Sequence, residues 1–137
     1  MFKHFLIPTD GSPVSSKAVK AGIALAKKLG TKVTAYCSIE PLVTVYGEGY
    51  VMDQKTIDRL EEHALNAAQK HVDAIGKLAK AAGVRFASVV AKSYTPYDGI
   101  VKTAMKKKCD VIFMASHGRR GLSRLIMGSV TQKVLSH

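Results

Sequence analysis

Short apolar segments alternate with amphipathic segments along this chain, and this alternation restricts the fold more than any other feature. Residues 2–8, 31–39, 84–91 and 110–116 are rich in aliphatic, β-branched or aromatic residues over the length of a strand. Between them, apolar residues recur at spacings of three and four, as on one face of a helix. Because such alternation favours parallel strands joined by helical crossovers, we predict a single α/β domain over residues 1–137. Its sheet should be open, parallel and Rossmann-like, with helices on both faces.

Residues typical of helix ends fall between the predicted strands. Ser12 and Pro13 are suited to the start of a helix, and Gly30 and Gly83 to helix ends. Residues 41–53 contain glycines without a clear hydrophobic period and are predicted to form a long loop. The predicted helices are residues 13–29, 57–82 and 97–108.

The composition is that of an ordinary globular protein, with 47% hydrophobic and 23% charged residues. No apolar run reaches the roughly 18 residues that span a bilayer, so we expect a cytoplasmic protein without membrane partners. Cys37 and Cys109 are too few for a disulfide framework and are expected to be reduced interior thiols. His63 and His71 are too far apart on their predicted helix for a paired metal site. No metal ligand or catalytic residue is predicted.

The net charge is unusual: the chain has 21 lysines and arginines but only 10 aspartates and glutamates, which gives a net charge of +11. Such an excess favours polyanionic partners, including nucleotides, nucleic acid and acidic lipid. The lysines are spread through the chain without the interleaved aromatic residues on which bases would stack. We therefore interpret them as solvated helix faces, and nucleic acid is not the expected partner.

The segment after the last predicted strand carries the residues best suited to binding chemistry. Gly118 permits a sharp turn, and Gly128 with Ser129 is predicted to open a last helix that continues through Val134. Main-chain N–H groups at a helix start, a hydroxyl and the nearby charge of Arg119 would suit phosphate oxygens. The alternative is that these glycines only form turns, and their spacing alone leaves both interpretations open.

The chain resembles the universal stress protein family over essentially its whole length. The resemblance lies in the opening FLIPTDGS, the strands TKVTAYCSIEP and DVIFMASHG, and the segment GLSRLIMGSVTQKVLSH. Nucleotide-binding members carry Gly, two residues, Gly, nine residues, then Gly and Ser or Thr. Here Ala115 stands at the first of these positions, and Gly118, Gly128 and Ser129 match the others. The resemblance implies the strand order 3-2-1-4, with the usual fifth strand expected to be missing because the sequence stops at residue 137.

The resemblance also implies a ligand, an adenine nucleotide, usually ATP with a divalent cation such as Mg or Mn, and a homodimer. By position, it assigns the phosphates to Gly118, Gly128 and Ser129, with Val130 and Thr131 as further donors. Ala115 would lie against the ribose, Asp10 would face the nucleoside, Ser38 would offer main-chain groups to adenine, and Pro8 and Thr9 would shape the wall.

Two of the candidate residues have plainer interpretations that the sequence leaves open. Asp10 either faces the nucleoside or is a turn residue that stabilises the start of the first helix. His117 either contacts phosphate, beside Arg119, or is an ordinary loop residue.

The predicted function is an ATP-binding stress-response module in which the nucleotide is a conformational or assembly signal. Hydrolysis should be slow at most, because the sequence contains no recognisable carboxylate that would position a water molecule for phosphoryl transfer. One alternative is a nucleotide-free dimeric interaction protein, which the methyl group of Ala115 favours. A slow ATPase is the other alternative.

Overall fold

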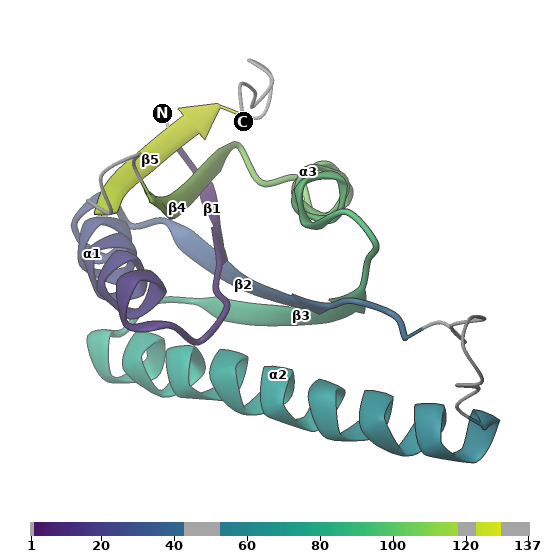
Figure 1. The fold of residues 1–137 in the computed structure, drawn as a ribbon. Helices are drawn as coiled ribbons and strands as arrows, with labels where there is room; N and C mark the ends of the chain where they lie inside the picture. The colour runs from purple at the N-terminus through teal and green to yellow at the C-terminus, as the bar shows by residue number, and fades with distance from the viewer. Residues whose placement is uncertain (1, 43–52, 118–122, 130–137) are drawn as a thin grey trace.

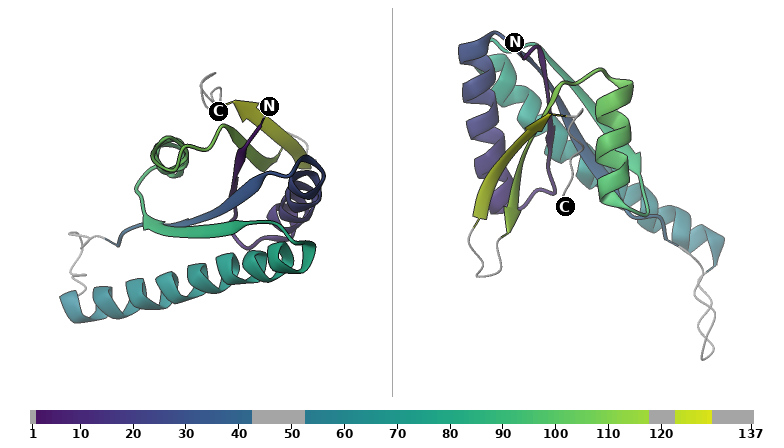
Figure 2. Two further views of the ribbon diagram at one scale, coloured as in Figure 1. Left: turned by 180° about the vertical axis from the view of Figure 1, so that it is seen from behind. Right: turned by 90° about the horizontal axis from the view of Figure 1, so that it is seen from above.

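The computed structural model describes residues 2–42, 53–117 and 123–129, and these residues form one mixed sheet flanked by helices (Figures 1 and 2). The strand order is β3-β2-β1-β4-β5. All neighbouring pairs from β3 to β4 are parallel. The predicted α/β class and the order 3-2-1-4 are therefore confirmed. The strands are β1 (His4–Pro8), β2 (Lys32–Ile39), β3 (Phe86–Lys92), β4 (Val111–His117) and β5 (Ser123–Ser129), and the helices are α1 (Pro13–Leu29), α2 (Gln54–Ala82) and α3 (Pro96–Lys106).

The ends of the first two helices follow from their capping residues. Ser12 accepts a hydrogen bond from the main-chain N–H of Ser15, and Asp53 does the same for Thr56 at the start of α2. Gly30 and Gly83 end these helices with φ angles of 68° and 75°. The predicted caps at Ser12, Gly30 and Gly83 are confirmed, whereas Asp53 starts α2 slightly earlier than the apolar spacing indicated.

Buried side chains form a separate cluster on each face of the sheet. Side chains of β1 alternate, so that Phe5 and Ile7 pack with α1 and α2, whereas Leu6 packs with α3. The ring of Phe5 stacks on Phe113 of β4, with centroids 6.2 Å apart. The first cluster also takes buried residues from both α1 and α2, and the second contains Ile100 of α3. This three-layer arrangement accounts for the nearly continuous apolar runs in β1 and β4.

The fifth position of the sheet is occupied, so the prediction of a missing fifth strand is wrong. β5 pairs antiparallel with β4, and its register places Ser123 opposite His117 and Ser129 opposite Val111. The prediction that Gly128 and Ser129 open a helix is wrong as well. The competing signal was the apolar run at residues 125–127, which suits a strand. A hairpin pairs backbone groups of β4 that would otherwise lie at an open sheet edge.

Other sequence-based predictions lie beyond the described residues. Most of the predicted loop at residues 41–53 lies outside them, as does the predicted continuation of a last helix through Val134. Among the described residues, none of the helices combines the length and the apolar character needed to cross a membrane.

Candidate functional site

The candidate site lies at the edge of the sheet where the parallel strands end. β1 lies between β2 and β4, and the chain passes from β1 to β2 through α1, whereas it reaches β4 from β3 through α3 on the other face. The winding direction therefore changes between β1 and β4. In open α/β sheets, ligands bind beyond the carboxyl ends of the strands at such a position. Residues 9–12, which connect β1 to α1, lie at this edge.

Hydroxyl and carboxylate groups hold the connection between β1 and α1 in a fixed turn. Asp10 Oδ1 accepts hydrogen bonds from the Ser12 N–H at 2.9 Å and from Ser15 Oγ at 2.8 Å. The hydroxyls of Thr9 and Ser15 are 3.0 Å apart, and the N–H of Gly11 donates to Thr9 Oγ1 at 3.1 Å. Hydrogen bonding to Ser12 holds the pKa of Asp10 below its ordinary value. These contacts support the interpretation of Asp10 as a turn residue. Both hydrogen bonds are accepted by Oδ1, and neither involves the other carboxylate oxygen, Oδ2.

The turn also depends on a glycine that packs against α2. Gly11 has a φ of +80°, and a Cβ atom at this position would collide with the imidazole ring of His71. His71 therefore approaches the main chain of the turn directly. The sequence contains no signal for this contact, because Gly11 and His71 are brought together only by the packing of α2 against the sheet.

We expect Gly11→Ala to lower the free energy of unfolding by about 1–3 kcal/mol, because it strains the backbone and forces the ring of His71 to move. The measurement is urea denaturation followed by circular dichroism. Gly30→Ala is the matched control, since Gly30 also has a positive φ but a Cβ there would meet nothing within 4 Å. Equal losses in the two variants would show that the contact with His71 contributes nothing.

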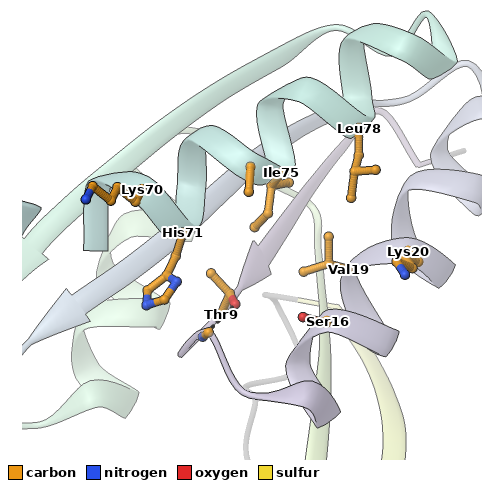
Figure 3. Close-up of a pocket in the computed structure, with 10 residues that line it drawn as sticks. Thr9, Ser16, Val19, Lys20, Lys70, His71, Ile75 and Leu78 are labelled. Carbon is orange, nitrogen blue, oxygen red and sulfur yellow. Dashed lines mark hydrogen bonds between the residues drawn. The ribbon is translucent and has the colours of Figure 1, made fainter. Parts of the chain in front are cut away.

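Behind this turn, a cavity of about 170 Å³ lies between α1 and α2 (Figure 3). Thr9 and Gly11 form part of its wall, and His71 extends from α2 towards the turn. Lys20 of α1 and Lys70 of α2 add positive charge to the lining. The sequence analysis placed His71 on a helix but did not connect it, or these two lysines, with the loop after β1.

Ser38 lies at the carboxyl end of β2, where β1 has already ended. Along β2, the N–H and C=O of one residue point to the β1 side and those of the next residue to the β3 side. The carbonyl oxygen of Tyr36 accepts from the N–H of Thr9 on the β1 side at 2.8 Å. The carbonyl oxygen of Ile39 accepts from the N–H of Ser93 on the β3 side at 2.9 Å. Ser38 must therefore direct its N–H and C=O to the β1 side. The register of β1 ends at Pro8, opposite Tyr36. The main-chain donor and acceptor of Ser38 thus face the end of β1.

The structure brings only part of the predicted site together. Pro8, Thr9, Asp10 and Ser38 lie on adjacent strand ends, and His117 ends β4 at the same edge of the sheet. Ala115 lies two positions earlier in β4, opposite Leu125.

The predicted phosphate-binding residues are not gathered around this loop. Gly128 and Ser129 lie opposite Ile112 and Val111, at the start of β4, and therefore at the opposite edge of the sheet. The register of β5 gives no support to their predicted contact with phosphate, and that role stays a prediction. The remaining predicted residues, Gly118, Arg119, Val130 and Thr131, lie outside the described residues.

The cysteines are unsuited to nucleophilic chemistry. Cys37 and Cys109 are both buried and free, which confirms the prediction of interior thiols. Burial raises the pKa of Cys37, and it raises that of Cys109 to about 11. Within the part of the chain that the structure describes, no group of three or more His, Cys, Asp or Glu side chains could hold a metal ion.

Known proteins of similar sequence and fold agree with this architecture. The sequence model of the universal stress protein family matches residues 1–137. Universal stress protein MJ0531 of Methanocaldococcus jannaschii is 32% identical over 139 residues, which cover 100% of this chain and 78% of that protein.

Solved structures extend the similarity to the fold. That of hypothetical protein MJ0577 is similar with a TM-score of 0.70 and 24% identity, covering 98% of this chain and 88% of the other. A universal stress protein in complex with cAMP is similar with a TM-score of 0.56 and 20% identity, covering 81% of this chain and 74% of the other. The whole-length match to the family model and the identity to MJ0531 show that the chain belongs to the universal stress protein family.

Proposed function

We propose that this protein binds an adenine nucleotide at the carboxyl edge of the sheet, beside the loop after β1. The observation that carries the proposal is the orientation of Ser38, whose main-chain N–H and C=O face the space beyond the end of β1. A donor and an acceptor side by side on one strand match the donor and acceptor atoms on the edge of adenine. The similar structure in complex with cAMP supports an adenine nucleotide as the class of ligand.

The residues around Ser38 suggest how the rest of the nucleotide would lie. Pro8 and Thr9 would form the wall next to the base, and Asp10 and Ala115 would lie near the ribose. His117 and the residues that follow β4, including Gly118 and Arg119, would lie towards the phosphates. The positive net charge of the chain, +11, favours an anionic ligand of this kind.

A divalent cation, Mg or Mn, would have to arrive with the phosphates of ATP. The described residues offer no cluster of three potential metal-binding side chains, and Asp10 already uses Oδ1 within its turn. The lowered pKa of Asp10 also makes it a weak base, which is poorly suited to activating a water molecule. This supports a binding module in which the nucleotide is a signal, with slow hydrolysis at most. A homodimer and a role in the stress response stay predictions from the family resemblance, and a cytoplasmic location stays a prediction from the hydropathy of the sequence.

The direct test is calorimetric titration of the purified protein with Mg-ATP and, separately, with cAMP. We expect saturable binding of at least one of them, with one site per chain. If neither ligand bound at millimolar concentration, the protein would be better described by the alternative function, a nucleotide-free interaction protein.

A further inference from the structure

A second cavity, of about 350 Å³, lies on the α3 side of the sheet, where β2 and β3 end. Its floor is formed by Tyr36 of β2 and Ala91 of β3, and one side by residues of α3 that include Gly99 and Lys102. The volume falls within the range of about 300–1,000 Å³ that is typical of small-molecule sites. None of the residues proposed to contact the nucleotide lines this cavity.

The hydroxyl of Tyr36 is an unusual feature of this cavity. The side chain is only 2% exposed, yet its Oη atom has no hydrogen-bond partner of acceptable geometry among the described residues. Burial raises the pKa of Tyr36, and the nearby side chains of Ser38 and Thr103 oppose this shift only in part. Buried hydroxyls without a partner are rare because they lose their hydrogen bonds to water without replacing them. A ligand in the cavity would supply the missing partner.

The Tyr36 hydroxyl lies in the space that a side chain at Gly99 of α3 would fill. A Cβ atom on Gly99 would collide with Oη of Tyr36 and would lie 3.1 Å from Oγ of Ser93. The side chain that glycine lacks would therefore displace the hydroxyl. Tyr36, Ser93 and Gly99 all line the same cavity.

Among the described residues, three charged side chains line the cavity, namely Lys92, Asp98 and Lys102. Lys92 is paired with Glu61 at 2.9 Å, and Asp98 accepts a hydrogen bond from Thr95 at 3.0 Å. Lys102 is exposed and forms no ion pair within the described part of the chain. The first turn of α3, where the helix dipole favours negative charge, borders the cavity through Asp98 and Gly99, and Asp98 itself supplies one such charge.

We propose that this cavity binds the oxyanion group of a small metabolite, a carboxylate or a phosphate, with Tyr36 Oη as hydrogen-bond donor and Lys102 as the cationic partner. A phenol is protonated at neutral pH, and burial raises the pKa of Tyr36 further, so that Oη can donate. Ser38, whose side chain lies near the Tyr36 hydroxyl, does not line this cavity, and the proposal does not depend on nucleotide binding.

The test compares the stabilisation of the protein by inorganic phosphate and by acetate, measured by thermal unfolding at constant ionic strength with chloride as reference. Tyr36→Phe removes only the hydroxyl. We expect this variant to be at least as stable as the original protein without ligand, and its affinity for the stabilising anion to be at least tenfold lower. Lys102→Gln should weaken the same response. Lys106→Gln is the matched control, because Lys106 is on the same helix but does not line the cavity.

The response to the two anions identifies the ligand class, since stabilisation by phosphate alone or by acetate alone selects one of them. The proposal would be overturned if neither anion stabilised the protein, or if Tyr36→Phe responded like the original protein. Retention of Mg-ATP binding by Tyr36→Phe would support two separate sites.

Discussion

Replacing Ser38 by proline is expected to weaken binding of Mg-ATP by about 10- to 100-fold, as measured by calorimetric titration. Proline removes the N–H that faces the end of β1, and an unmade buried hydrogen bond costs about 1–3 kcal/mol. The fold should survive, because the neighbouring residues Cys37 and Ile39, and not Ser38, direct their peptide groups to β3. Proline is tolerated in a strand where the N–H has no partner in the ladder.

Ser38→Ala is the matched control for this experiment, because it removes the hydroxyl and keeps the main-chain N–H. We expect this variant to bind Mg-ATP within about twofold of the original affinity, because the proposed main-chain contact is kept. A tenfold loss would require the binding free energy to change by about 1.4 kcal/mol. Circular dichroism should show both variants folded. Normal affinity in folded Ser38→Pro would place the adenine elsewhere, and equal losses in both variants would assign the contact to the side chain.

Replacing Phe5 by alanine should lower the free energy of unfolding by about 3–5 kcal/mol, the usual loss for a buried aromatic residue. Phe5 is 0% exposed and stacks on Phe113, so its removal leaves a cavity between β1, β4 and the helices on that face. Domains of this kind are stable by about 5–15 kcal/mol, and the loss would be a large part of that total. Urea denaturation of the two proteins measures it.

Leu60→Ala provides the comparison, because Leu60 of α2 is also a large apolar residue but is 42% exposed. Surface substitutions usually change stability by about 0.5 kcal/mol or less. If Phe5→Ala and Leu60→Ala caused the same small loss, the stacked pair of Phe5 and Phe113 would not be part of a tightly packed core.

The sequence predicts those parts of the fold in which local signals agree. The apolar run of β1, the cap at Ser12 and the glycine at position 30 all indicate a strand, a turn and a helix, and the structure has them in that order. At β5 the local signals conflict. Gly128 with Ser129 suggests a helix start, whereas the apolar run before them suits a strand, and pairing with β4 decides between the two.

The site shows the same division between local and long-range information. The family resemblance implies Thr9, Asp10 and Ser38 as site residues, and the strand ends at which they lie can be recognised along the chain. The contact of Gly11 with His71 and the cavity at Tyr36 depend on which helix packs on which face of the sheet. Local pattern carries no information about these contacts, since they join segments that are far apart in the sequence.

The most direct test of the proposed nucleotide site is a titration of ¹⁵N-labelled protein with Mg-ATP, followed by the positions of the amide resonances. The account predicts saturable shifts that are largest for the amides of Thr9, Gly11 and Ser38, at the ends of β1 and β2. The absence of shifts at millimolar nucleotide, or shifts confined to another part of the chain such as α3, would contradict it.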